Sequence, residues 1–139
     1  MRISRILPLL ALLAACSDSA GPGGDVRADA LVDRSPPPGG NNVTVTIENR
    51  GSRPVLLPRC GERIMLAVER RVGGAWQEYS GDVCAFDIVS VPLELAPGAT
   101  ATAGREIRDS GRFRARVDLW HADEPETVRS VRTSGFDIR

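Results

Sequence analysis

The sequence predicts an all-β domain, an antiparallel β-sandwich of seven or eight short strands. Apolar and polar residues alternate with a period of two in several segments, which is typical of strands buried on one face. Turn-forming residues recur every 8–12 residues along the same region. No segment has the 3.6-residue apolar period of an amphipathic helix. Many short strands with regular turns favour a sandwich or a barrel.

The first predicted strand begins at Asn42, where Val43, Val45 and Ile47 alternate with polar residues. The clearest alternation in the chain is the segment 113–119, with apolar residues at every second position. The other predicted strands are residues 55–57, 63–72, 76–79, 88–95, 100–107 and a last segment within 127–139. Turns rich in Gly, Pro, Asn, Asp or Ser separate several of them. Pro92 identifies the segment 88–95 as an edge or bulged strand. Trp76 is expected in the core.

The amino terminus has the order of a secretory signal: Arg2 and Arg5, an apolar run over residues 6–13, and then small residues. The apolar run is too short for a transmembrane helix, which needs about 20 residues. Leu13-Ala14-Ala15-Cys16 resembles the lipobox of bacterial lipoproteins. The resemblance implies cleavage after residue 15, lipidation of Cys16 and anchoring in a membrane of the cell envelope. An ordinary cleaved signal with an incidental cysteine is the alternative.

Residues 16–41 are predicted to be the lipidated cysteine and a flexible tether, since this stretch is rich in Gly, Pro, Ser and Asp. The folded domain is then expected over residues 42–139. Ser17 follows the cysteine, and the absence of Asp there favours the outer membrane, on its periplasmic side or its surface. The sequence leaves inner versus outer membrane open.

If Cys16 is lipidated, Cys60 and Cys84 remain as a pair. Export to an oxidising compartment favours a disulfide between them. A metal site built on two thiolates is the alternative, but further ligands at suitable spacing are missing.

A second resemblance rests on Asp109-x-Gly111-x-Phe113-x-Ala115, which is similar to the corner between strands E and F of immunoglobulin-like domains. Leu95-Ala96-Pro97-Gly98 is similar to the turn before strand E in bacterial immunoglobulin-like envelope modules. Phe113 replaces the family's tyrosine and Ala115 its cysteine. Cys60 and Cys84 are also too close in sequence for the antibody-type bridge. The resemblance implies an immunoglobulin-like sandwich.

Catalytic chemistry has little support in the sequence. His121 is the only histidine, no nucleophile motif such as G-x-S-x-G is present, and His121 is expected to be solvated in a loop. Asp123, Glu124 and Glu126 follow it, but their spacing matches no defined cation-binding loop. We therefore expect no enzyme activity, no cofactor and no metal.

A candidate binding face comprises Arg112, Arg114 and Arg116, on the side of the predicted strand opposite Phe113, with Trp120 at its end. Arginine binds phosphate and carboxylate groups in a bidentate manner, so this face could bind an anionic envelope polymer, a lipid headgroup or an acidic protein. In the alternative interpretation it is a solvated sheet face whose arginines meet cross-strand acids such as Glu69.

The chain has a formal net charge of zero, so no basic field indicates a nucleic-acid partner. The sequence favours a non-enzymatic, lipid-anchored module that binds an envelope protein or polymer. The alternative is a protease inhibitor that uses the turns at Gly73-Gly74 or Pro97-Gly98. The oligomeric state is left open.

Overall fold

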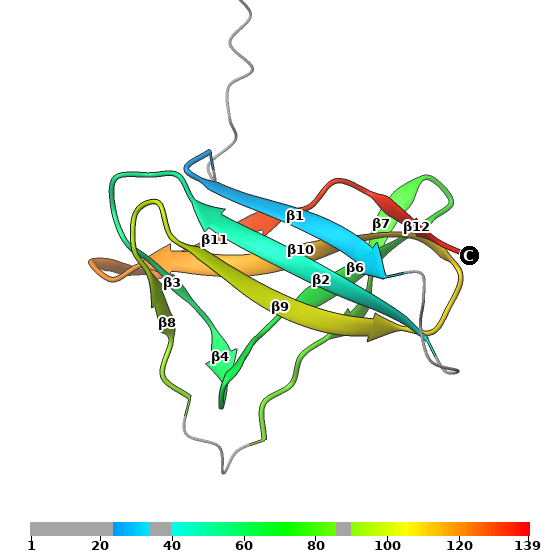
Figure 1. Ribbon diagram of the computed structural model, residues 1–139, viewed down its shortest axis with the longest axis horizontal. Helices are drawn as coiled ribbons and strands as arrows, with labels where there is room; N and C mark the ends of the chain where they lie inside the picture. Colours follow the sequence, from blue (N-terminus) through cyan, green and yellow to red (C-terminus); the bar gives the residue numbers. More distant parts are fainter. Residues whose placement is uncertain (1–23, 34–39, 86–89) are drawn as a thin grey trace, which may run out of the picture.

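The computed structural model describes residues 24–33, 40–85 and 90–139, and within these ranges the regular elements are all β-strands. The predicted fold class is confirmed: antiparallel sheets pack in a sandwich-like arrangement that is compatible with an immunoglobulin-like domain (Figure 1). No helix long and apolar enough to cross a membrane is found among the described residues.

The smaller sheet has three strands in the order β1-β2-β9. These are β1 (Val26–Asp33), β2 (Asn41–Asn49) and β9 (Thr100–Ile107), and both pairings are antiparallel. The alternation predicted for β2 is confirmed, because Val43, Val45 and Ile47 are buried.

The larger sheet is built around β10 (Gly111–His121), which has partners on both edges. Two strands pair with one edge of β10: β6 (Ala67–Val72) with its first half and β3 (Val55–Leu57) near its end. The other edge pairs with β12 (Phe136–Ile138) and β11 (Glu124–Arg132). The outer strands are β7 (Ala75–Gly81), next to β6, and β8 (Leu93–Leu95), next to β3.

The chain leaves the larger sheet between β3 and β6 to form a short hairpin of β4 (Arg59–Cys60) and β5 (Arg63–Ile64). Cys60 of this hairpin is joined to Cys84, beyond the end of β7, with 5.4 Å between the two Cα atoms. The predicted disulfide is therefore confirmed, and it holds the hairpin against the segment that follows β7.

The core lies between the two sheets, and β10 supplies its centre. Phe113 is fully buried, with its ring 5.1 Å from Tyr79 in an edge-on contact and 6.4 Å from Phe136. The other buried apolar side chains of β10 are Ala115, Val117 and Leu119, and those of the smaller sheet include Val45, Ile47 and Ile107.

The structure corrects the predicted domain boundary. Residues 26–33, which the sequence placed in the tether, form β1 and pair with β2 from Val26↔Asn49 to Asp33↔Asn42. This segment has too few apolar residues to fold alone, but the exposed edge of β2 supplies hydrogen bonds, and Val26 and Ala28 reach the core. The signal segment 1–15, Cys16 and tether residues 17–23 and 34–39 lie outside the described residues.

The described residues form twelve strand segments, more than the seven or eight predicted. Two predicted strands are each divided in two: residues 63–72 into β5 and β6, and the carboxyl-terminal segment into β11 and β12. β1 and β4 are additional. Of the predicted strand 88–95 only Leu93–Leu95 is a strand, and residues 86–89 lie outside the described part.

Candidate binding groove

The arginines of the predicted binding face project from the outer surface of the larger sheet. Arg112, Arg114 and Arg116 alternate along β10 with Phe113 and Ala115, which are buried in the sandwich. This follows from the period-two geometry of a strand.

Acidic groups of neighbouring strands pair with all three arginines. Arg112 Nη1 lies 3.0 Å from a carboxylate oxygen of Asp137, and Arg114 donates a hydrogen bond to Glu69. The guanidinium of Arg114 also stacks 4.4 Å from the ring centre of Trp76. The alternative interpretation of this face, that its arginines meet cross-strand acids, therefore describes the contacts of these side chains.

Glu69 is the centre of this charge cluster and is only 7% exposed. Arg116 and Arg132 approach its carboxylate to 3.6 and 3.4 Å, in addition to the hydrogen bond from Arg114. Burial by itself raises the pKa of the Glu69 carboxyl, but the Arg114 hydrogen bond and the three guanidinium charges outweigh it and lower the pKa. Glu69 is therefore a carboxylate that holds three arginines on the sheet surface.

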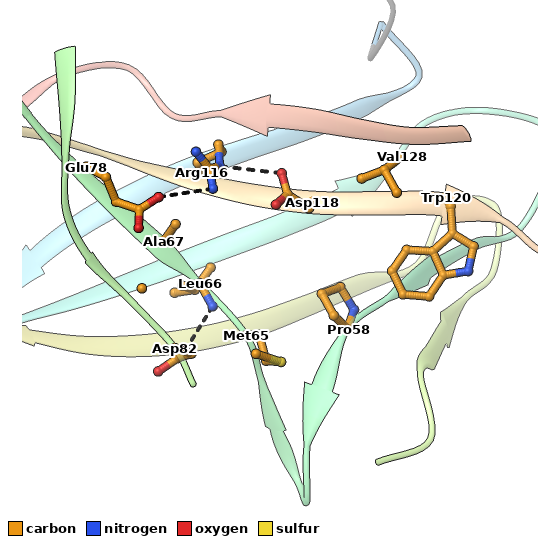
Figure 2. A pocket seen from close by; sticks show the side chains of 11 residues that line it. Pro58, Met65, Leu66, Ala67, Glu78, Asp82, Arg116, Asp118, Trp120 and Val128 are labelled. Carbon is orange, nitrogen blue, oxygen red and sulfur yellow. Dashed lines mark hydrogen bonds and ion pairs between the residues drawn. The ribbon is translucent and has the colours of Figure 1, made fainter. Parts of the chain in front are cut away.

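A groove of about 390 Å³ lies further along β10, where β3 and β6 diverge. Its apolar end is formed by Trp120, Pro58 and Val128, while Glu78 and Arg116 lie at the other end (Figure 2). Because the chain leaves the sheet between β3 and β6, no strand among the described residues pairs with this edge of β10 between Arg116 and Trp120. The remaining lining residues are Met65, Leu66, Ala67, Gly81, Asp82 and Asp118.

The lining of the groove contains three carboxylates, those of Glu78, Asp82 and Asp118, and one guanidinium, that of Arg116. The carboxylate of Asp82 is also paired with Arg105, outside the groove. Arg116 lies 3.4 Å from both Glu78 and Asp118, in addition to its contact with Glu69. Its Nε has no hydrogen-bond partner although it is buried. The positive charge of Arg116 is thus shared among three carboxylates.

Of the predicted binding residues, the structure brings Arg116 and Trp120 together in this groove and leaves Arg112 and Arg114 outside it. Pro58, Met65 and Val128 were not predicted from the sequence as site residues. Pro58 and Met65 reach the groove through the divergence of β3 and β6, a tertiary feature that has no local sequence pattern. Val128 reaches it from β11, on the other edge of β10. Pro58 between two apolar segments was the one available signal of a break in the sheet.

Two other expectations about aromatic and histidine residues were wrong. Trp76 is half-buried beside Arg114 rather than in the core. His121 is not solvated: it is 6% exposed, and its Nδ1–H donates to the carbonyl oxygen of Pro54 over 2.9 Å. The reason is that β10 continues to His121 and β11 begins at Glu124, so that the predicted loop is a tight turn.

Two of the three acidic residues after His121, Asp123 and Glu124, have protein partners. Arg53 donates hydrogen bonds to Asp123 and Glu124, and the bond from Arg53 lowers the pKa of Asp123. Among the described residues, no group of three or more His, Cys, Asp or Glu side chains is placed to hold a metal ion.

The turn at Gly73-Gly74, named for the inhibitor alternative, closes the hairpin of β6 and β7. Both glycines have positive φ angles, 57° and 86°, as in a tight two-residue turn. Such a turn presents two residues without side chains, so it offers a protease little specific contact.

Comparison with known proteins shows only weak similarity to the solved structures described here. No protein-family model matches the chain, and no curated protein sequence matches it. The X-ray structure of Northeast Structural Genomics Consortium target SoR45 is 13% identical, with 82% of this chain and 86% of that chain covered and a TM-score of 0.48. A β-glucosidase from Listeria innocua in complex with gluconolactone is 12% identical, with 81% of this chain and 17% of that chain covered and a TM-score of 0.24. These TM-scores are too low to carry an argument about fold or function.

Proposed function

We propose that this protein is a non-enzymatic, lipid-anchored binding module of the bacterial cell envelope, and that its partner is an envelope protein. The observation that carries the proposal is the groove on the larger sheet, where half-buried Trp120 and exposed Val128 lie beside three carboxylates. Aromatic side chains in concave, partly apolar surroundings are typical anchors of protein interfaces.

The charge of the groove favours a protein partner over an anionic polymer. The arginines that would attract an anion are paired with Glu69, Glu78, Asp118 and Asp137. A polymer would have to displace these carboxylates from the arginines. A protein segment with an apolar side chain next to a lysine or arginine meets both halves of the groove, Trp120 and the acids, without breaking these pairs.

The lipobox supports the anchor. Gly24, the first described residue, is eight positions after Cys16. A chain of this length reaches at most about 28 Å. Lipidation at Cys16 would therefore keep the domain, and with it the groove, close to the membrane surface.

The anchor is tested by labelling growing cells with a palmitate analogue and fractionating their membranes. We expect label on the wild-type protein in the membrane fraction. The variant Cys16→Ala should carry no label and should leave that fraction. Unlabelled wild-type protein would contradict lipidation.

The groove is tested by placing a photocrosslinking amino acid at Val128 in intact cells. Val72, an exposed valine on the hairpin of β6 and β7, is the control position. We expect a discrete protein to be captured from position 128 only. Trp120→Ala should abolish this capture, and Trp76→Ala, which changes a tryptophan of the same sheet outside the groove, should preserve it.

Capture that persists in Trp120→Ala, or equal capture from both positions, would contradict the groove as the binding site. Capture of a protease, together with its stoichiometric inhibition by the purified protein, would favour the inhibitor alternative.

A further inference from the structure

β9 forms an open edge of the smaller sheet, since within the described residues it pairs with β2 alone. Asn49 N–H donates to Ala99 C=O over 3.0 Å, which sets the alternation of hydrogen bonds along this pair. In an antiparallel ladder, every second residue turns its N–H and C=O away from the partner strand. Thr102 and Gly104 therefore direct these groups to the open edge.

The open edge of β9 lacks the usual protection against strand addition. Residues 100–104 contain no charge, proline or bulge, and they pair with β2 without a register shift. The opposite edge strand, β1, carries charged side chains such as Arg27 and Asp29. Proteins normally protect an edge strand with charged residues, prolines or bulges, because its free N–H and C=O groups are a template for another strand.

An arginine-rich cleft of about 580 Å³ adjoins the carboxyl-terminal half of this edge. Gly104, Arg105 and Glu106 of β9 form one side of the cleft, and Tyr79 and Ser80 of β7 belong to the lining as well. Arg63 and Arg108 complete it. The cleft therefore lies where the edges of the two sheets face each other.

The cleft has an excess of positive charge. Its lining contains three arginines and one acid, Glu106, which pairs with Arg108 at 2.9 Å. Asp82, outside the lining, pairs with Arg105 and lies 3.7 Å from Arg63. The side chains of Arg63 and Arg108 remain 69% and 76% exposed, so both guanidinium groups can reach a further carboxylate.

We propose that the open edge of β9 binds an extended segment of a partner protein as an added strand, and that an acidic side chain of this segment enters the cleft of Arg63, Arg105 and Arg108. Strand addition supplies main-chain hydrogen bonds, and the cleft supplies specificity for one side chain. Arginine is suited to a carboxylate because its planar guanidinium donates two parallel hydrogen bonds.

This surface shares no residue with the groove around Trp120, so the inference does not depend on the proposed function. A second copy of the chain satisfies the observations less well. In a two-fold symmetric pair of β9 strands with Thr102 opposite Gly104, Glu106 of one copy lies opposite Thr100 of the other. In this register β9 of the second copy places no acidic residue at the cleft.

The test uses a library of random heptapeptides, selected for binding to the full chain carrying Cys16→Ser. Thr102→Pro removes an outward N–H from the β9 edge without breaking a bond to β2. Ala30→Pro is the matched control, because Ala30 has its N–H on the open edge of β1 by the same alternation. Circular dichroism and thermal melting of each variant verify its fold.

We expect the selected peptides to contain Asp or Glu and to bind Thr102→Pro at least tenfold more weakly than the parent and Ala30→Pro. Changing both Arg63 and Arg108 to Ser, or the peptide's acid to its amide, should cause a similar loss. The proposal is overturned if the peptides lack acids, bind Thr102→Pro unchanged, or cannot be obtained. It is also overturned if sedimentation shows a dimer that Thr102→Pro dissociates, since the occupant is then a second copy.

Discussion

Arg114 donates a hydrogen bond to the buried carboxylate of Glu69, on the outer face of the larger sheet. Arg116 and Arg132 contact the same carboxylate, so its removal leaves three guanidinium groups without their common partner. We expect Glu69→Gln to lower the free energy of unfolding by about 2 kcal/mol. Glu78→Gln is the control: Glu78 is exposed and, among the described residues, forms an ion pair with Arg116 only, so its loss should cost less than about 0.5 kcal/mol. Urea unfolding at neutral pH measures both.

The lowered pKa of Glu69 also predicts a pH dependence. Near the ordinary glutamate pKa, about 4.3, the unfolded chain binds more protons at this residue than the folded one. The contribution of Glu69 is therefore complete above that pH, and it is lost as the pH falls through the lower pKa of the folded state. The difference in stability between wild type and Glu69→Gln should shrink below about pH 4.3. A difference that stays constant down to pH 3 would contradict a lowered pKa.

Asn49 carries no charge, but we expect its substitution to reduce the stability of the fold strongly. It is fully buried, and its side-chain amide donates to the carbonyls of Arg53 and Leu95 over 2.8 and 2.9 Å. Its Oδ1 accepts from Gly51 N–H over 3.0 Å. We expect Asn49→Ala to cost about 3 kcal/mol, because the buried carbonyl of Leu95 and the partly buried carbonyl of Arg53 lose their donor. Asn49→Asp should cost more, because a carboxylate would face both carbonyls.

Asn42→Ala, at an exposed position of the same strand, is the control for Asn49 and should be nearly neutral. Equal effects at the two positions in urea unfolding would show that the three hydrogen bonds of Asn49 contribute little to stability.

Because of the disulfide between Cys60 and Cys84, we expect the stability of the fold to depend on redox conditions. Cys60 and Cys84 are 24 residues apart. In the chain-entropy model, closing a loop of about 25 residues stabilises the fold by about 3.5 kcal/mol. The double variant Cys60→Ser/Cys84→Ser should lose about this amount. A reducing agent should destabilise the wild type similarly and leave the double variant unchanged; if it destabilises the double variant too, the effect does not come from this bond.

The sequence predicted the strands whose side chains alternate over several residues, such as β2, β9 and β10, because burial on one face imposes that pattern directly. Prediction from the sequence failed where the formation or length of a strand depends on the strand beside it. Only Val26 and Ala28 of β1 are fully buried, so the composition of this segment is typical of a tether. It forms a strand because it pairs with the edge of β2, which its own sequence does not indicate. His121 failed for a related reason, because the length of β10 is set by its pairing with β11.

The site was predicted in part. Strand periodicity placed Arg116 and Trp120 on the outer face of β10, and it also gave Glu69 as a partner of the arginines. The groove itself depends on the divergence of β3 and β6, and the cleft at β9 on the meeting of two sheet edges. Both join residues that are far apart in sequence, such as Pro58 with Val128 and Arg63 with Arg105, so no local pattern could identify them.

β1 (Val26–Asp33) lies before Asn42, where the sequence predicted the domain to begin, yet it pairs with β2 as part of the smaller sheet. A chain that begins at Asn42 lacks a strand paired with β2 and exposes core residues beneath it. We expect it to be at least about 3 kcal/mol less stable than a chain that begins at Gly24. Val26→Asp should reproduce much of this loss in the full chain, since Val26 is 7% exposed, whereas Leu31→Asp should not, since Leu31 is 73% exposed. Urea unfolding compares the four proteins, and equal stability of the two truncated chains would mean that β1 does not belong to the folded domain.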